Sequence, residues 1–318
     1  MTVAGAIEAE NLQKTFKGGV RALDGVSFGV EAGTVFGMLG PNGAGKTTAV
    51  RILTTILPPD GGSASILGYD VRRQPAQVRR VIGLAGQYAA VDENLSGLEN
   101  LRMIGQLTHL PRRAATARAR ELLAQFELSD AAGRSVKTYS GGMRRRLDLA
   151  AALVDRPPVL FLDEPTTGLD PFSRVSLWSV IAELVRDGTT VLLTTQYLEE
   201  ADRLADRLIV IDHGRVIAEG TSSELKAQLG RSVLDLDLGA EELAEKAHAA
   251  LVEQLGRGAT RRASTVEVPL DEGPQGVVDA LRVLDSVGLT PAGLTVREPS
   301  LDDVFLALTG HVAEDSPQ

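Results

Sequence analysis

The stretch GPNGAGKTT, residues 40–48, decides the fold of this chain. It matches the phosphate-binding pattern G-x-x-x-x-G-K-[ST] at every fixed position. The preceding residues 34–39, TVFGML, predict a short buried strand, and residues 47–57 predict a helix that Pro58 stops. Strand, loop and helix in this order favour a phosphate loop over an incidental glycine-rich turn.

The residue types in this loop suit an anion. Glycines lack Cβ and adopt positive φ readily, which turns successive backbone N–H groups inward as an anion nest. The helix start adds unpaired amides and about half a positive charge. Lys46 is expected to reach the β- and γ-phosphates of a nucleotide, and Thr47 to offer its hydroxyl to Mg²⁺. The residues expected to contact the nucleotide here are Gly40, Asn42, Gly43, Gly45, Lys46, Thr47 and Thr48.

Composition narrows the class of protein. A length of 318 residues suggests about two domains, and 43% hydrophobic with 24% charged residues is ordinary for a soluble globular protein. The net charge of −9 argues against a nucleic-acid binder, which usually has a basic face. The absence of cysteine excludes disulfides and thiolate metal sites. Residues 1–10 do not resemble a signal peptide, and no run of about 18 apolar residues occurs, so we expect a soluble cytoplasmic protein.

Two carboxylates follow a second apolar run. Residues 159–162, VLFL, predict a buried parallel strand, and Asp163 and Glu164 stand at its carboxyl end. Burying two acids without a partner is costly, and Mg²⁺ is the expected partner of Asp163, directly or through water. Glu164 is expected to orient or deprotonate the water that attacks the γ-phosphate, beside Lys46. The alternative is a strand-end acid pair in solvent, which the phosphate loop makes less favoured.

Two glutamines also follow predicted strands. Gln87 comes after residues 81–85, and Gln196 comes after residues 190–195. Ligand sites in open α/β sheets gather at such carboxyl ends, so Gln87 is a candidate ligand for Mg²⁺ or the attacking water. Taken alone, Gln87 is also compatible with an ordinary loop residue.

Residues 94–153 predict helices and therefore a helical subdomain packed at the edge of the α/β core. Ser96 and Glu99 have the spacing of a capping box, and Pro111 separates two helices. Further on, Ser140 can cap a helix while the two following glycines leave its first amides open to an anion. This second phosphate-reading helix start, formed by Ser140, Gly141 and Gly142, is consistent with an ordinary capped helix or with a site shared by two chains.

Three aromatic or imidazole side chains have two interpretations each. Phe16 lies in a polar loop, where it could stack on an adenine ring or tuck onto the sheet. Trp178, the only tryptophan, lies in a predicted helix over residues 172–186 and fits a core position better than a functional one. His213 fits a hairpin between strands 207–211 and 215–219 better than a ligand role.

These residues together give residues 5–229 a close resemblance to the nucleotide-binding subunit of ATP-binding-cassette (ABC) transporters. Six motifs occur in the family's order: the phosphate loop 40–48, the Q-loop Gln87, the signature 139–143, the pair Asp163-Glu164, the D-loop 168–171 and the switch position Gln196. The resemblance implies an α/β fold of the P-loop NTPase, ABC-ATPase type, with a RecA-like core, an antiparallel β subdomain and an α-helical insert. It also implies two ATP molecules sandwiched in a head-to-tail dimer, with Phe16 stacking on adenine and Asp170 at the nucleotide.

The sequence departs from the family in two places. The signature is usually Leu-Ser-Gly-Gly-Gln, so Tyr139 and Met143 are variants around an intact Ser-Gly-Gly. The family's switch histidine is replaced by Gln196, which can donate a hydrogen bond to the γ-phosphate but cannot take up a proton. We expect hydrolysis to persist through Glu164, with Gln196 contributing orientation.

Three stretches resemble the daunorubicin/doxorubicin-resistance branch of drug-export ATPases: residues 139–148, 194–202 and 298–310. The branch implies export of a lipophilic compound through a separate integral membrane permease subunit, docked at the groove near residues 87–101. It implies a peripheral position on the cytoplasmic side of the cell membrane. The expected partners are that permease and a second copy of this chain, in a homodimer, with no nucleic acid.

Residues 230–318 predict a small α+β domain that follows the nucleotide-binding domain of residues 1–229. Ser300 and Asp303 have capping-box-like spacing at its last helix, residues 256–264 are expected to form a loop, and the tail is expected to fray from Ala313. The domain has no catalytic constellation, and the resemblance suggests a regulatory or dimer-bracing role. The expected strands and helices are 232–238, 241–255, 265–270, 276–287, 289–297 and 300–308.

Two other functions compete with transport. Soluble ABC ATPases of translation or DNA repair usually carry tandem cassettes or a long coiled coil, but one phosphate loop occurs here and about 90 residues separate Lys46 from Ser140. An inactive module that binds nucleotide without turnover is the other alternative. Comparing the ATPase rates of the wild type and Glu164→Gln separates it from an enzyme.

Overall fold

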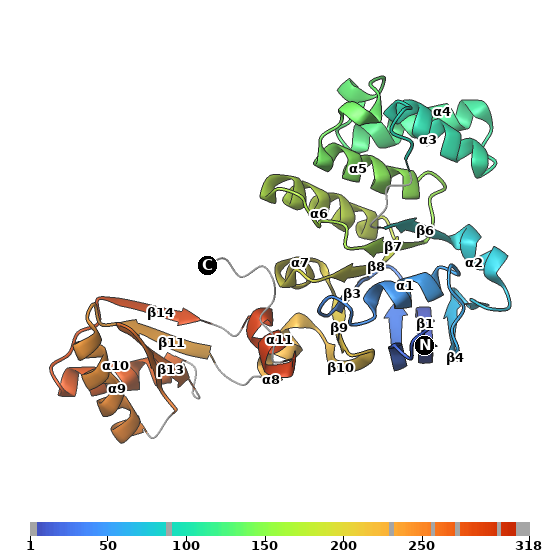
Figure 1. Cartoon of the computed structure of the whole chain (residues 1–318). Helices are drawn as coiled ribbons and strands as arrows, with labels where there is room; N and C mark the ends of the chain where they lie inside the picture. The colour runs from blue at the N-terminus through green and yellow to red at the C-terminus, as the bar shows by residue number, and fades with distance from the viewer. Residues whose placement is uncertain are drawn as a thin grey trace. The chain divides into compact units, whose positions relative to one another are not determined.

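The computed structural model describes residues 5–86, 91–228, 232–255, 258–270, 274–297 and 300–309. This part of the chain forms two compact units, the first ending at Ser222 and the second beginning at Ser223 (Figure 1). The expected domain boundary between residues 229 and 230 lies outside the described residues, as does the expected frayed tail from Ala313.

A six-stranded sheet in the order β10-β9-β3-β8-β7-β6 forms the centre of the first unit. The strands from β9 to β6 are parallel neighbours, and β10 closes the sheet antiparallel to β9. Every residue of β3, β7 and β8 is buried, as their apolar runs predicted. Because these three strands are adjacent and parallel, the segments that follow them emerge at one edge. The strands are β3 (Val35–Leu39), β6 (Ile82–Ala85), β7 (Val159–Asp163), β8 (Thr190–Thr195), β9 (Arg207–Asp212) and β10 (Arg215–Gly220).

A second, antiparallel sheet in the order β2-β1-β4-β5 packs on one face of the first, which agrees with the expected antiparallel subdomain. Its apolar residues share one buried cluster with helix α1 and with Val159, Phe161 and Leu192 of the central sheet. The strands are β1 (Gly5–Thr15), β2 (Arg21–Glu31), β4 (Gly61–Ile66) and β5 (Tyr69–Asp70).

Helix α1 (Lys46–Leu53) is shorter than the predicted helix 47–57. The hydroxyl of Thr54 donates to the carbonyl of Val50 at 2.8 Å, and Thr55 then takes a left-handed φ of 64° that ends the helix. Helix α2 (Pro75–Val81) was not predicted, and it includes Val81, which the sequence assigned to the strand that begins at Ile82.

The helical insert consists of α3 (Gly97–Leu107), α4 (Arg112–Gln125) and α5 (Gly141–Ala152), with single 3-10 turns at Ser129–Ala131 and Val136–Thr138. The predicted capping box is confirmed: the amide of Ser96 donates to Glu99 Oε2 at 2.8 Å, and the amide of Glu99 donates to Ser96 Oγ at 3.3 Å. Buried residues of the insert and of the sheet strands β7 and β8 belong to one apolar cluster, which also includes Leu177 and Ile181 of α6 (Pro171–Arg186). The insert is therefore part of the core of this unit.

Trp178 of α6 is 2% exposed, which confirms the core interpretation. His213 occupies the turn between β9 and β10, as predicted, with a left-handed φ of 46°. Helix α7 (Leu198–Leu204) follows β8 and was not predicted. No helix among the described residues is both long and apolar enough to cross a bilayer.

The second unit contains an antiparallel sheet in the order β12-β13-β11-β14, with α9 (Glu241–Leu255) and α10 (Pro274–Ser286) packed on it. The strands are β11 (Ser232–Asp237), β12 (Thr260–Arg262), β13 (Thr265–Leu270) and β14 (Gly293–Arg297). The remaining helices are α11 (Leu301–Thr309) and α8 (Ser222–Gln228), whose first residue is the last of the first unit. The prediction of a loop over residues 256–264 was wrong, because β12 pairs with β13. All three residues of β12 are polar and exposed, so no apolar alternation marks this edge strand.

The predicted cap at the last helix is present. The amide of Asp303 donates to Ser300 Oγ at 3.1 Å, and the amide of Ser300 donates back to Asp303 Oδ2 at 2.9 Å. The shorter aspartate thus takes the place of the usual glutamate in a capping box.

Candidate nucleotide-binding site

The phosphate loop has the conformation that its glycines predicted. Gly40, Gly43 and Gly45 have φ values of 155°, 83° and 115°. A Cβ atom on Gly40 would lie 2.2 Å from the carbonyl oxygen of Ile211, and one on Gly45 would lie 2.3 Å from that of Ala22. These two positions therefore exclude any side chain. The pocket over the loop is lined by Ala22, Pro41, Asn42, Gly43, Ala44, Gly45, Lys46, Thr47, Thr48 and Glu164.

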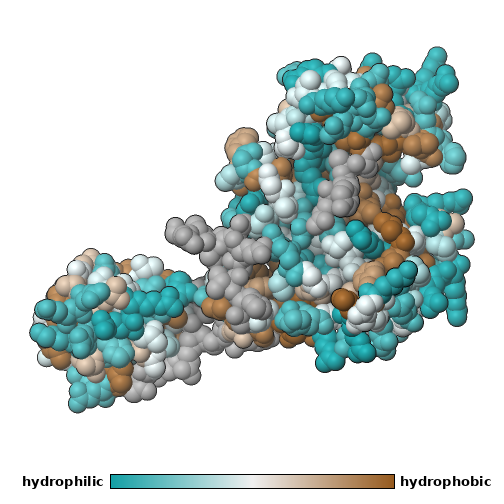
Figure 2. All heavy atoms as spheres, in the orientation of Figure 1, coloured by the Kyte–Doolittle hydropathy of each residue, from teal (hydrophilic) through white to brown (hydrophobic). Residues whose placement is uncertain are grey.

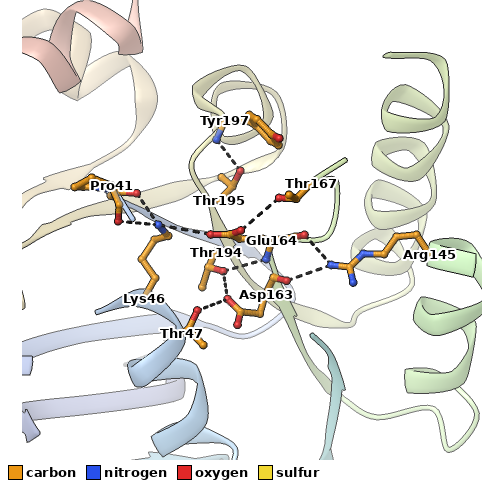
Figure 3. Close-up of polar contacts among 11 residues, drawn as sticks. Pro41, Lys46, Thr47, Arg145, Asp163, Glu164, Thr167, Thr194, Thr195 and Tyr197 are labelled. Atoms are coloured by element: carbon orange, nitrogen blue, oxygen red, sulfur yellow. Dashed lines mark hydrogen bonds and ion pairs between the residues drawn. The ribbon is translucent and has the colours of Figure 1, made fainter. Parts of the chain in front are cut away.

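Lys46 lies inside this pocket and is 4% exposed. Its ammonium donates to the carbonyls of Gly40 at 2.6 Å and Pro41 at 3.1 Å, and it lies 3.8 Å from Glu164 Oε1 (Figure 3). The structure thus brings the phosphate loop with Lys46 close to Glu164, which follows β7 more than a hundred residues later in the sequence.

Asp163 lies where a hard cation could be held. Its Oδ1 atom accepts hydrogen bonds from Thr194 Oγ1 at 2.5 Å and from Thr47 Oγ1 at 3.3 Å. One carboxylate and one hydroxyl beside a phosphate loop form a donor set suited to Mg²⁺, which uses few protein ligands and completes its shell with water and phosphate oxygens. No cluster of three or more His, Cys, Asp or Glu residues suited to a metal occurs in the described ranges. The residues therefore fit Mg²⁺ held jointly with a nucleotide.

Glu164 has an unusual backbone conformation. Its φ is 51°, in the left-handed region that non-glycine residues rarely occupy. Its amide donates to the carbonyl of Thr194 at 3.0 Å, and Thr167 Oγ1 donates to its Oε2 atom at 3.4 Å (Figure 3). Glu164 lines two pockets, the one over the phosphate loop and one beside Gly141 and Gly168. Strained backbone conformations of this kind are common at active sites, where they fix the direction of a functional side chain.

Gln196 follows β8 at the same edge of the sheet. Its Oε1 atom is buried and has no hydrogen-bond partner within the described residues. Gln196 does not line the pocket over the phosphate loop, so its role at a nucleotide stays a prediction.

Comparison with known proteins identifies the family. The family model described as "ABC transporter" matches residues 23–167. The chain is 52% identical over 98% of its length to the daunorubicin/doxorubicin resistance ATP-binding protein DrrA of Streptomyces peucetius, 94% of which is covered. It is 40% identical over 98% of its length to the Nod factor export ATP-binding protein I of Sinorhizobium fredii, 88% of which is covered. This chain belongs to the ATP-binding subunits of the ABC transporter family.

Solved structures agree with this assignment. The ATP-binding subunit of an ABC transporter superimposes with a TM-score of 0.64 at 29% identity, over 71% of this chain and 93% of that one. A dimeric post-hydrolysis state of the cassette MJ0796, bound to ADP and Pi, superimposes with a TM-score of 0.63 at 27% identity, over 68% of this chain and 98% of that one. The expected ABC-ATPase fold, ATP binding and ATP hydrolysis are therefore confirmed, and translation or DNA repair is not favoured.

Several motif residues of the family lie apart from the phosphate loop in this chain. Ser140 caps α5, where its Oγ accepts the amide of Met143 at 3.2 Å, and neither Ser140 nor its two following glycines lines the pocket over the loop. Phe16 is 42% exposed and also does not line that pocket. The Q-loop residue Gln87 lies outside the described residues. Their roles at a nucleotide stay predictions.

The D-loop residue Asp170 already has a structural role. Its carboxylate caps α6 by accepting from the amide of Ser173 at 2.9 Å and from its hydroxyl at 2.6 Å. The hydrogen bond from the Ser173 hydroxyl is the main reason that the pKa of Asp170 is lowered. A contact between Asp170 and nucleotide would have to keep or replace this cap.

Sequence reasoning missed three residues of the site. Ala22 lines the phosphate pocket from β2, and Thr194 holds both Asp163 and the amide of Glu164. A threonine at the end of an otherwise apolar strand is the signal that could have identified Thr194. Arg145 binds the backbone after β7, but three successive arginines at 144–146 point about 100° apart around a helix, so sequence alone does not show which one turns inward.

A buried carboxylate supports the segment that carries Gln196. Glu200 of α7 is fully buried, and Trp178 Nε1 donates to its Oε1 atom at 3.0 Å. Burial raises the pKa of Glu200, although the Thr195 hydroxyl and the hydrogen bond from Trp178 partly oppose this shift. The folded chain therefore favours the protonated form of this side chain.

We expect Glu200→Gln to stabilise the protein at neutral pH. Because the pKa of Glu200 is higher in the folded than in the unfolded state, its contribution to stability is present at pH below the unfolded value, about 4.3, and is lost as pH rises through the folded value. The neutral amide keeps the acceptor for Trp178 and removes this loss. Thermal unfolding from pH 4 to 8 should show a Tm difference that grows with pH. Glu199→Gln, at an exposed neighbour, serves as the control, and equal pH profiles for wild type and Glu200→Gln would contradict the prediction.

Proposed function

We propose that this chain is the energy-coupling subunit of an exporter that moves a lipophilic drug or antibiotic through a separate integral membrane permease. The site geometry supports the ATPase part, because Lys46, Asp163 and Glu164 converge on one pocket. The identity of 52% to a daunorubicin/doxorubicin resistance protein along nearly the whole chain supports the export part. The proposed location is peripheral, on the cytoplasmic side of the cell membrane.

The proposed active form is a head-to-tail dimer of two copies. The phosphate loop of one copy would bind an ATP molecule that the partner's Ser140-Gly141-Gly142 turn covers. The separation of Ser140 from the loop pocket within one chain supports this arrangement, as does the dimeric state of a solved relative. Phe16 would stack on the adenine, and Asp170 would lie at the seam.

Each polar residue of the pocket has a proposed task. Lys46 would exchange its two carbonyl contacts for β- and γ-phosphate oxygens, and Glu164 would accept the proton of the attacking water. Bound through Thr47 and Asp163, with Gln87 as a further ligand, Mg²⁺ would neutralise charge on the phosphates. Phosphoryl transfer depends mainly on positioning and charge neutralisation, which these residues supply.

Gln196→Ala is expected to lower kcat for ATP hydrolysis by about tenfold with little change in KM, as for loss of one hydrogen bond to a charged group. Gln196 directly follows β8, whose Thr194 binds the amide of Glu164, and its NH₂ group could donate to the γ-phosphate. Gln196→His, which also carries a donor, should retain most of the rate. If a steady-state assay gives the wild-type rate for Gln196→Ala, the proposed role of Gln196 is wrong.

The transport function is tested by reconstitution. Hydrophobic residues gather between the helical insert and the rest of the first unit on the face drawn in Figure 2, and Met103 and Leu107 of α3 are exposed. Helix α3 overlaps the stretch 87–101 that is proposed to contact the permease. A membrane protein that co-purifies with the chain is expected to be that permease. Vesicles containing both proteins should accumulate daunorubicin with ATP, and should not do so with Glu164→Gln. If an ATPase-active preparation transports nothing and binds no membrane protein, the export proposal is wrong.

A further inference from the structure

The side chain of Arg145, on helix α5, binds four backbone carbonyls at once. Its Nη2 atom donates to Glu164 at 2.7 Å and to Asp163 at 3.2 Å (Figure 3). Its Nε atom donates to Pro165 at 2.6 Å. Its Nη1 atom donates to the carbonyl of Gly86, the residue that follows β6. The side chain is only 14% exposed. Arg145 therefore joins helix α5, which begins within the signature 139–143 and is called the signature helix below, to the segments that follow β6 and β7.

The chemistry of arginine explains this contact. A guanidinium group presents five N–H donors in a rigid plane, whereas a lysine ammonium presents three donors from a single point. Burial lowers the pKa of Arg145, but the nearby carboxylates of Asp148, Asp163 and Glu164 oppose this shift and favour the charged form. The positive charge is thus kept close to the two acids of the site.

The carbonyl contact matters most at Glu164. Its left-handed φ of 51° persists only because neighbouring groups fix the backbone on both sides. Thr194 binds its amide at 3.0 Å, and Arg145 binds its carbonyl at 2.7 Å. If the second contact is lost, this backbone can relax, and the carboxylate then turns away from the pocket that it shares with Lys46.

Helix α5 also carries Ser140 at its N-cap, five residues before Arg145. A separation of five residues is about 7.5 Å along a rigid helix axis. In the proposed dimer, Ser140 contacts the ATP held by the partner, whereas Glu164 acts on the ATP held by its own chain. Arg145 thus lies on a short, stiff connection between the two nucleotide sites.

We propose that Arg145 is a positioning residue that fixes the backbone of Glu164 to the signature helix, so that engagement of Ser140 by one nucleotide sets the Glu164 carboxylate at the other. This inference rests on the proposed two-chain ATPase. Arg145 takes no direct part in the chemistry and acts through Glu164.

Arg145→Lys tests the planar contact while keeping the charge beside Asp148. We expect kcat for ATP hydrolysis to fall about tenfold to a hundredfold, with KM for ATP within about twofold of the wild type. Arg145→Gln, whose planar amide has two donors, gives a second variant if the lysine variant does not fold, and thermal unfolding checks both. Arg146→Lys is the matched control on the same helix, because lysine can keep the ion pair with Glu127. It should retain the wild-type kcat.

Two double variants separate positioning from general damage. In a Glu164→Gln background, Arg145→Lys should not lower the residual rate further, and ATP-driven pairing of copies should persist. When Arg145→Lys is combined with Ser140→Ala, kcat should fall by less than the product of the two single effects. Multiplicative losses in either pair would overturn the inference.

The two proposals can fail separately. A wild-type protein that hydrolyses and pairs on ATP, together with Arg145→Lys at full kcat, overturns the inference alone. A wild-type protein that does neither overturns the proposed function as well.

Discussion

Replacement of Glu164 by glutamine is expected to reduce ATP hydrolysis by about a hundredfold to ten-thousandfold, the usual contribution of a general base. The amide keeps the size of the side chain, and it can still accept from the hydroxyl of Thr167, which lies 3.4 Å from Oε2 in the wild type. It cannot accept the proton of the attacking water. Phosphate release from purified protein under saturating ATP measures the loss.

Binding of ATP should survive the same change. Glu164 lies 3.8 Å from the Lys46 ammonium, and removing its charge leaves that ammonium more attractive to phosphate. ATP-dependent dimerisation, followed by gel filtration, should therefore become persistent in Glu164→Gln. Glu199→Gln, an exposed neighbour of Gln196, should behave as wild type. Equal hydrolysis rates for Glu164→Gln and the wild type would favour a nucleotide-binding module without turnover.

Gly45→Ala should abolish nucleotide binding and lower the free energy of unfolding by about 2–4 kcal/mol. Two effects add: a φ of 115°, and a Cβ atom 2.3 Å from the carbonyl oxygen of Ala22 and 2.9 Å from Leu23 Cδ2. Because the Ala22 oxygen belongs to the backbone of β2, relief requires moving a strand or the loop. Either movement changes the positions of the amides that precede α1.

Gly68→Ala separates these two effects. Gly68 has a φ of 81°, but no atom lies within 4 Å of its Cβ position, so only the backbone cost of about 1 kcal/mol applies. Chemical denaturation and calorimetric titration with ATP give both quantities for each variant. If Gly45→Ala bound ATP as well as Gly68→Ala does, nucleotide binding would not need the positive φ and close approach of Gly45.

The sequence predicted the fold and the candidate site where local chemistry fixes structure. The phosphate loop could be read because its glycines are needed for positive φ and close approach, and Asp163 and Glu164 could be read because acids rarely end a buried strand without a ligand. The capping pairs at Ser96 and Ser300 could also be predicted, because each joins two residues that are three positions apart in the sequence.

Contacts that depend on tertiary structure could not be read in this way. The inward direction of Arg145 depends on how α5 packs against the loop after β7, and the left-handed turn at Glu164 depends on Thr194 of a neighbouring strand. Strand β12 was missed because its three exposed polar residues show no apolar alternation, and its position depends on pairing with β13. The helix after the phosphate loop was predicted too long, because the termination at Thr54 and Thr55 is a detail of side-chain and backbone geometry.

The apolar cluster shared by the helical insert and the central sheet limits how this protein can move. Leu122 and Phe126 of the α4 region belong to the same buried cluster as Leu160 of β7 and Leu193 of β8. A hinge would separate these side chains and expose them to water, whereas packed layers that slide by small amounts keep them covered. Any rearrangement of the insert during the ATP cycle should therefore be a shear motion of limited amplitude, and proteolysis should not release the insert as a stable fragment.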